Sequence, residues 1–144
     1  MASNKDKCRR MFQDVWNAGK VEYMQELLAE DYQGTIPLVG QVDLASFRAT
    51  VGAFRRAFPD LRFEVRDLIA EGDKVAIRWT ATGTSKGEFM GMPASNRRTT
   101  VNGFTLSEFK GGKIANDHTE YDEVSFLHSL GVKLPELEGA GAEP

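Results

Sequence analysis

The chain has 144 residues, of which 41% are hydrophobic, and this is enough for one domain with a single core and a modest internal cavity. A formal net charge of −3 argues against a nucleic-acid partner, because phosphate backbones are bound by clustered Lys and Arg. The sequence contains no apolar run of about 18 residues and no apolar secretory segment near its start, so we expect a cytoplasmic protein without a membrane partner.

Helical periodicity marks the first part of the chain. Apolar residues recur with helical spacing from Cys8 to Trp16, which predicts an amphipathic helix that ends at residues 17–19. The same spacing over residues 21–28 predicts a second helix, which forms a hairpin with the first. A third helix is predicted over residues 43–58, where the proline that follows disfavours further helical geometry.

Strand-like alternation marks the second part of the chain. Apolar and polar residues alternate over residues 61–65 and again over residues 75–81, which predicts a hairpin with one apolar face. Residues 99–109 and 114–121 predict a second hairpin, whose Gly-Gly turn supplies the positive φ angles that a two-residue loop requires. Asp122 then caps a last short helix.

Helices followed by antiparallel strands predict an α+β fold, in which a curved antiparallel sheet wraps around the N-terminal helices. We interpret residues 1–134 as a single domain. Residues 135–144 are rich in Glu, Gly and Ala and have little to bury, so a flexible C-terminal tail is expected there.

A short apolar tongue lies between the two predicted hairpins. Residues 87–98 read GEFMGMPASNRR, in which Phe89, Met90 and Met92 stand beside glycines that let the backbone bend. This run resembles the GxxxGMPPTxRR-type turn of the SnoaL-like polyketide cyclases, a branch of the nuclear-transport-factor-2-like superfamily. A second block, residues 9–32, resembles the opening helices of that family and their exit at an acidic residue followed by tyrosine.

The resemblance covers residues 5–132 in order and implies a cone-shaped domain with a cavity between sheet and helices, commonly assembled as a sheet-to-sheet homodimer. In the family, an acid/base Asp lies on the last hairpin, with a supporting His across from it. An alignment without gaps on the Gly-Lys-Ile turn puts these two positions on Thr119 and Thr105. A shift of one residue puts Glu120 at the acidic position and leaves no His opposite.

The densest group of ionisable residues outside the predicted helices is residues 116–122, NDHTEYD. Because side chains alternate along a strand, either Asp117 and Tyr121 or His118 and Glu120 can face an interior. His118 and Glu120 would form an imidazole–carboxylate acid/base pair. Asp117 would instead be a carboxyl whose pKa is raised by an apolar wall toward the range of a general base, with Tyr121 donating a hydrogen bond to an oxyanion. The sequence leaves both arrangements open.

Large apolar and aromatic side chains on several predicted elements are expected to line a pocket for a small hydrophobic ligand. They are Trp16, Tyr32, Phe54, Phe58, Trp79, Phe89, Met90, Met92 and Phe104. The sequence holds two His and one Cys without a metal-ligand spacing, so neither a metal site nor a cofactor is expected.

Two hypotheses about function follow. In the first, the chain is a cofactor-free SnoaL-like enzyme that catalyses aldol-type cyclisation or isomerisation of a hydrophobic, carbonyl-bearing ligand. Asp117, His118 and Glu120 are then the candidate acid/base residues. In the second, the chain is a non-catalytic protein of the same fold that binds a hydrophobic small molecule or serves as a dimeric accessory domain, which the threonine at the acidic position favours.

Overall fold

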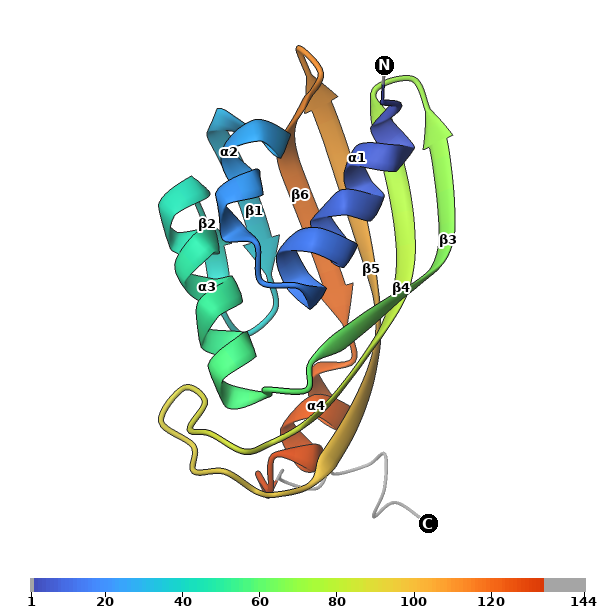
Figure 1. Cartoon of the computed structure of the whole chain (residues 1–144). Helices are drawn as coiled ribbons and strands as arrows, with labels where there is room; N and C mark the ends of the chain where they lie inside the picture. Colours follow the sequence, from blue (N-terminus) through green and yellow to red (C-terminus); the bar gives the residue numbers. More distant parts are fainter. Residues whose placement is uncertain (1, 134–144) are drawn as a thin grey trace.

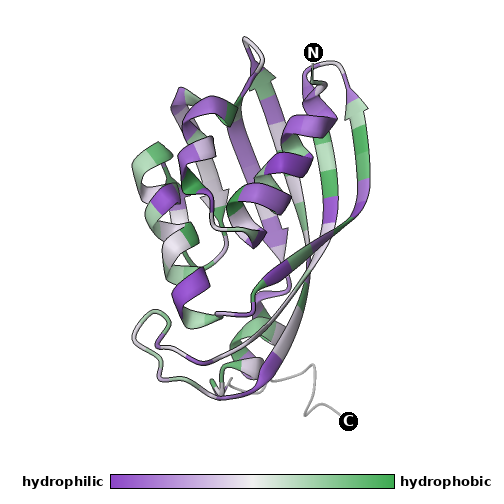
Figure 2. Ribbon diagram, in the orientation of Figure 1, coloured by the Kyte–Doolittle hydropathy of each residue, from purple (hydrophilic) through white to green (hydrophobic). Residues whose placement is uncertain are grey.

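The computed structural model describes residues 2–133, so the tail expected at residues 135–144 lies outside the described residues. A six-stranded sheet in the order β2-β1-β6-β5-β4-β3 curves around helices that lie against its concave face (Figure 1). Hydrophobic and hydrophilic residues alternate along the strands (Figure 2), as expected for a sheet with one packed face and one open face. No helix within residues 2–133 is long and apolar enough to cross a membrane.

The first predicted helix is confirmed. Helix α1 (Asn4–Arg10) continues directly into a π-helix, η1 (Met11–Asn17). Ser3 begins the helix with a capping box, in which its hydroxyl accepts from the Asp6 backbone N–H at 3.1 Å and the Asp6 carboxylate accepts from the Ser3 backbone N–H at 3.3 Å. The apolar positions that predicted the helix are buried against the sheet, namely Cys8, Met11, Phe12, Val15 and Trp16.

The second helix is shorter than predicted. A 3-10 turn, η2 (Val21–Tyr23), is followed by a single helical turn, α2 (Met24–Leu27), and the chain then becomes strand β1 (Leu28–Ile36). Residues 28–36 pair with β6, and this tertiary pairing overrides the local helical spacing at residue 28. Strand β2 (Gly40–Val42) pairs antiparallel with β1 at the edge of the sheet.

The third helix is confirmed as α3 (Leu44–Ala57), which ends before Pro59. Asp43 caps it, because the Asp43 carboxylate accepts from the Ser46 backbone N–H at 2.9 Å. The helix buries Phe47 and Val51 against the concave side of the sheet.

Both hairpins are confirmed, as β3 (Arg62–Glu71) with β4 (Lys74–Thr84) and β5 (Arg98–Lys110) with β6 (Lys113–Tyr121). The turn glycines at 111 and 112 have φ angles of +60° and +80°. The sheet is mixed rather than wholly antiparallel, because β1 pairs with β6 in parallel through a connection that includes α3. Helix α4 (Glu123–Ser129), capped by Asp122, packs beside β5.

Candidate active site

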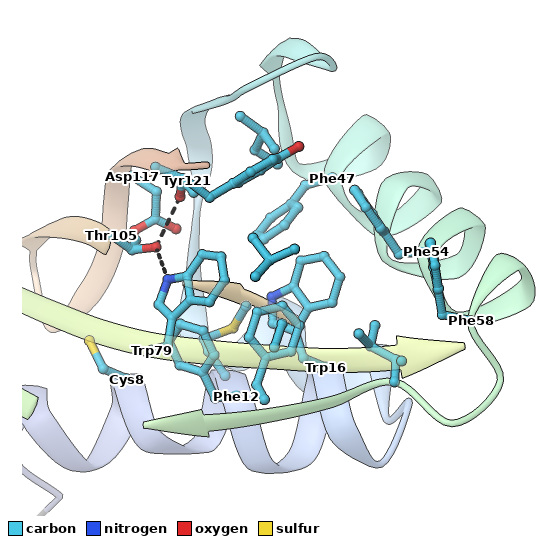
Figure 3. Close-up of a pocket in the computed structure, with 18 of the residues that line it drawn as sticks. Cys8, Phe12, Trp16, Phe47, Phe54, Phe58, Trp79, Thr105, Asp117 and Tyr121 are labelled. Carbon is cyan, nitrogen blue, oxygen red and sulfur yellow. Dashed lines mark hydrogen bonds between the residues drawn. The ribbon is translucent and has the colours of Figure 1, made fainter. Parts of the chain in front are cut away.

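An apolar cavity of about 100 Å³ lies between the concave sheet and the helices. Five of the residues expected to contact a ligand line it: Trp16, Tyr32, Phe54, Phe58 and Trp79. Figure 3 shows aromatic side chains of α3 across the cavity from those of η1 and β4, with polar groups gathered at one end. The cavity is thus an aromatic box with one polar end.

The other expected lining residues lie outside the cavity. Phe89 is buried in the tongue, where its ring packs 4.7 Å from that of Phe54, measured between centroids, and so it supports the cavity wall from behind. The Met90 side chain is 58% exposed at the tip of the tongue, and Met92 is half-buried without lining the cavity. Phe104 is 53% exposed because β5 turns its even-numbered residues away from the helices.

The orientation of β6 separates the two arrangements that the sequence left open. Asp117, Thr119 and Tyr121 line the cavity. His118 and Glu120 lie on the opposite, exposed face, where His118 Nε2 and Glu120 Oε2 are 2.7 Å apart. The structure therefore brings Asp117 and Tyr121 to the cavity and does not bring His118 and Glu120 to it.

Asp117 is a buried carboxylate with a hydrogen bond to each oxygen. The Tyr32 hydroxyl donates to Oδ2 at 2.8 Å, and the Ser107 hydroxyl donates to Oδ1 at 2.5 Å. Burial raises the pKa of the Asp117 carboxyl above its ordinary value, and the hydrogen bonds from Ser107 and Tyr32 offset part of that rise. Burial beside this carboxylate also raises the pKa of the Tyr32 hydroxyl, which keeps Tyr32 a donor.

The Tyr32–Asp117 contact depends on a glycine. In the parallel pairing of β1 with β6, Gly34 lies opposite Asp117. A Cβ atom at residue 34 would stand 2.5 Å from the Tyr32 hydroxyl oxygen, so glycine leaves the space through which the phenol reaches the carboxylate. The sequence prediction missed Tyr32 and Ser107 as partners of Asp117, and the glycine two residues after Tyr32 was the local signal for a close approach in β1.

A second polar group in the cavity consists of Trp79, Thr105 and Thr119. The Trp79 indole N–H donates to the Thr105 hydroxyl oxygen at 3.0 Å (Figure 3), and the hydroxyl oxygens of Thr105 and Thr119 are 3.0 Å apart. Gly103 lies opposite Trp79 on β5, and a Cβ there would stand 2.3 Å from the indole ring. As at Gly34, a strand glycine lets an aromatic side chain reach a polar partner.

Tyr121 uses its hydroxyl elsewhere. The Tyr121 hydroxyl donates to the backbone carbonyl of Pro37 at 2.7 Å, so this proton is already engaged. Burial, with a smaller effect of Glu123, raises the pKa of Tyr121. Tyr121 therefore closes the wall between β6 and the β1–β2 turn.

Cys8 lies at the same end of the cavity as Asp117. Burial, and next the negative charge of Asp117, raise the pKa of the Cys8 thiol to about 12. The thiol is therefore protonated near neutral pH and acts as a small apolar lining group. Within residues 2–133, no three His, Cys, Asp or Glu side chains are grouped to hold a metal ion.

A curved, unclosed mixed sheet that holds an apolar cavity against N-terminal helices defines the nuclear-transport-factor-2-like class of α+β proteins. Within that class, a family model described as SnoaL-like polyketide cyclase matches residues 6–130. The chain belongs to the SnoaL-like polyketide cyclase family, and the resemblance seen in the tongue is confirmed.

Solved structures share the fold. A candidate SnoaL-like polyketide cyclase from Jannaschia sp. CCS1 aligns with a TM-score of 0.83 at 22% identity, over 91% of this chain and 93% of that one. IdmH, a candidate polyketide cyclase from Streptomyces antibioticus, aligns with a TM-score of 0.79 at 28% identity, over 91% and 100% of the two chains. AclR, a candidate hydroxylase from Streptomyces galilaeus, aligns with a TM-score of 0.79 at 30% identity, over 92% and 97%. No curated protein sequence matches this chain.

Proposed function

We propose that this protein is a cofactor-free acid–base catalyst that acts on a small hydrophobic, carbonyl-bearing ligand, with Asp117 as the general base. One observation carries the proposal: a buried carboxylate, held by Tyr32 and Ser107, forms the polar end of an otherwise aromatic cavity. A raised carboxyl pKa brings the group closer to the working pH, where a general base is most effective.

The proposed reaction needs only proton transfers. Asp117 takes a proton from the carbon next to the ligand carbonyl, and the electron pair of that C–H bond forms an enolate. In an aldol-type cyclisation, the enolate carbon bonds to a second carbonyl carbon and Asp117 returns the proton to the resulting alkoxide. In an isomerisation, Asp117 returns the proton to a different carbon. Neither route changes the oxidation state of the system.

Cavity size restricts the ligand. An engineered cavity of about 150 Å³ in another protein binds benzene, so a space of about 100 Å³ suits a single small ring or a short branched chain. A larger ligand requires the wall formed by the tongue to move, and Phe89 is the side chain that holds it against Phe54, Phe58 and Phe126.

A second candidate function is binding without turnover. In the alignment without gaps, Thr119 and Thr105 occupy the positions where the family carries its acid and its supporting His, and a threonine hydroxyl is not an ionisable group near neutral pH. A hydrophobic ligand would then be held by the same aromatic box. This alternative predicts thermal stabilisation by a ligand with no chemical change in it.

Exchange of carbon-bound hydrogen separates the two functions. We expect the protein in deuterated buffer to replace the α-hydrogens of cyclopentanone with deuterium, as followed by proton NMR, and Asp117→Asn to abolish that exchange. Saturation-transfer NMR shows whether cyclopentanone binds. If it binds but keeps its α-hydrogens, the catalytic proposal is wrong and the binding function remains.

We further propose that the protein is a homodimer joined through the outer face of the sheet. Ile69, Phe104 and Leu106 are 67%, 53% and 39% exposed on this face. They are flanked by an ion pair, Arg78 with Asp67, and by the polar pair of His118 and Glu120. An apolar strip bordered by both signs of charge is self-complementary, as a two-fold interface requires.

The dimer is tested by molar mass in solution from light scattering. We expect a dimer for the natural sequence and a monomer for Phe104→Glu. Val124→Glu is the matched control, because Val124 is 64% exposed on α4, away from the outer face. A monomeric natural protein, or a dimeric Phe104→Glu variant, contradicts this assembly.

A further inference from the structure

We propose that Trp79, Thr105 and Thr119 form a hydrogen-bond relay whose last donor, the Thr119 hydroxyl, holds the carbonyl oxygen of the ligand. This inference rests on the proposed function, since it assigns the oxygen of the same substrate whose carbon Asp117 deprotonates. The ligand class follows: a small ketone or aldehyde with its carbonyl directed at β6 and its hydrocarbon part among the aromatic side chains.

A count of hydrogens supports the relay. The Trp79 indole N–H, the Thr105 hydroxyl and the Thr119 hydroxyl bring three donor hydrogens to two hydrogen bonds. The indole can only donate, so it supplies the first bond, and one of the threonines supplies the second. Among the described residues neither hydroxyl has a further partner, so one hydroxyl hydrogen remains for an acceptor in the cavity.

We assign the direction of the relay from the order of the contacts, since either threonine hydroxyl can donate to the other. Thr105 is only 7% exposed and receives the indole hydrogen, whereas Thr119 is more exposed and ends the chain of contacts. When Thr105 donates to Thr119, each bond polarises the next, and the free hydroxyl hydrogen is the one on Thr119. A carbonyl oxygen that is buried without a hydrogen bond costs free energy, and this cavity has few polar groups. The Thr119 hydroxyl therefore favours one orientation of the ligand.

The spacing between the two polar groups suits an enolisable carbonyl. Asp117 and Thr119 are two positions apart on the cavity face of β6, which places them about 7 Å apart along the strand. A carbonyl oxygen at about 3 Å from Thr119 leaves the neighbouring carbon within about 3–3.5 Å of Asp117. One strand thus presents an oxyanion donor and a base to adjacent atoms of one ligand.

The relay is fixed before any ligand enters. Trp79 is 4% exposed and its ring lies against Gly103 on the neighbouring strand, so the indole N–H has little freedom to turn away from Thr105. Both threonines stand on paired strands, in direct register with each other. Donors held in this way cost no reorganisation when negative charge develops on the carbonyl oxygen.

The test uses cyclopentanone labelled with ¹³C at the carbonyl, and cyclopentane as its apolar counterpart. We expect the ¹³C resonance of bound cyclopentanone to move downfield with the natural protein and to return toward its value in a hydrocarbon solvent with Thr119→Val. Affinity for cyclopentanone should fall about fivefold in Thr119→Val while affinity for cyclopentane is kept. Thr119→Ser should restore the downfield shift, and Thr100→Val, on an exposed position of β5, should leave it unchanged.

Asp117→Asn separates this inference from the proposed function. It should lose deuterium exchange but keep the downfield carbonyl shift, whereas Thr119→Val should lose the shift and slow the exchange about 10²–10³-fold. A downfield shift without exchange in the natural protein would defeat the catalytic proposal and leave the carbonyl site standing. An unchanged shift in Thr119→Val, or no binding of cyclopentanone to the natural protein, overturns the inference.

Discussion

The two faces of β6 carry the same kinds of group in different surroundings. On the outer face, Glu120 contacts His118 at 2.7 Å, and both side chains are more than half exposed, at 67% and 59%. On the inner face, Asp117 is 8% exposed and its carboxylate oxygens accept from Tyr32 and Ser107. Solvent screens the outer pair, whereas the apolar surroundings of the inner carboxyl raise its pKa. Burial, rather than residue type, therefore distinguishes the candidate base from the carboxylate of an exposed polar pair.

Removing each carboxylate in turn tests which face of β6 carries the base. We expect Asp117→Asn to lower the rate of α-hydrogen exchange by about 10²–10⁴-fold, because no other carboxylate among residues 2–133 lines the cavity. Glu120→Gln should leave the rate unchanged, since this side chain points away from the cavity. The rates are measured by proton NMR in deuterated buffer. Loss of exchange in Glu120→Gln with retention in Asp117→Asn would reverse the assignment of the two faces.

Two alanine substitutions in neighbouring positions of β1 test the close approach at Gly34. Gly34→Ala places a Cβ 2.5 Å from the Tyr32 hydroxyl oxygen and should displace the phenol from Asp117, at a cost of about 1–3 kcal/mol in the free energy of unfolding. Gln33→Ala, on the exposed face of the same strand, should cost less than about 0.5 kcal/mol. Urea denaturation followed by tryptophan fluorescence measures both, and equal effects would show that the close approach at Gly34 has no energetic role.

Tyr32→Phe tests how the inner carboxylate is tuned. The Tyr32 hydrogen bond lowers the pKa of Asp117, so its removal should raise that pKa further. Because a general base must be deprotonated, the acid limb of the pH–rate profile should move to higher pH in Tyr32→Phe. His118→Ala, on the outer face, should not move this limb. A limb that stays in place in Tyr32→Phe would mean that another group controls the rate.

The raised pKa of Asp117 also gives stability a pH dependence. Burial raises the folded-state pKa above 3.8, so between the two pKa values the folded protein holds this proton more tightly than the unfolded chain does. Asp117 then contributes its full stability below the unfolded-state pKa, and this contribution is lost as pH rises through the folded-state pKa. Asp117→Asn should accordingly raise Tm at neutral pH, with a gain that shrinks in acid. Calorimetry at several pH values measures it, and a gain that grows in acid would contradict the sign.

The smallest effects are expected on the outer face. His118→Ala should change the free energy of unfolding by less than about 0.5 kcal/mol, because a contact between two exposed polar side chains contributes little in water. Chemical denaturation of the variant and the natural protein at the same salt concentration measures the difference. A loss above about 2 kcal/mol would contradict a solvent-exposed position for this contact at the border of the proposed interface.

The sequence predicts the fold well where periodicity is local. The α3 helix and the two hairpins follow from spacing, caps and turn glycines within single segments. Strand β1 was missed because its assignment depends on parallel pairing with β6, about eighty residues later in the chain, which local spacing does not report. The same missed pairing hid Tyr32 as the partner of Asp117.

The candidate site was predictable only in part. The cluster at residues 116–122 identified the right strand, yet its facing depends on register, since a shift of one residue exchanges the two sets of side chains. From the sequence, Thr105 and Thr119 were recognised only as two alignment positions at which the family has titratable residues and this chain has none. The proposed role of this pair as a donor depends on the Trp79 contact, which requires the space above Gly103 on a neighbouring strand.

Titration of the Asp117 carboxyl decides whether this buried group is the general base. The ¹³Cγ chemical shift of Asp117, assigned with Asp117→Asn, reports its protonation as pH is varied. We expect a midpoint above the ordinary aspartate value of about 3.9, and the same midpoint in the acid limb of the exchange rate. An ordinary midpoint, or an exchange rate that does not follow this titration, would contradict it.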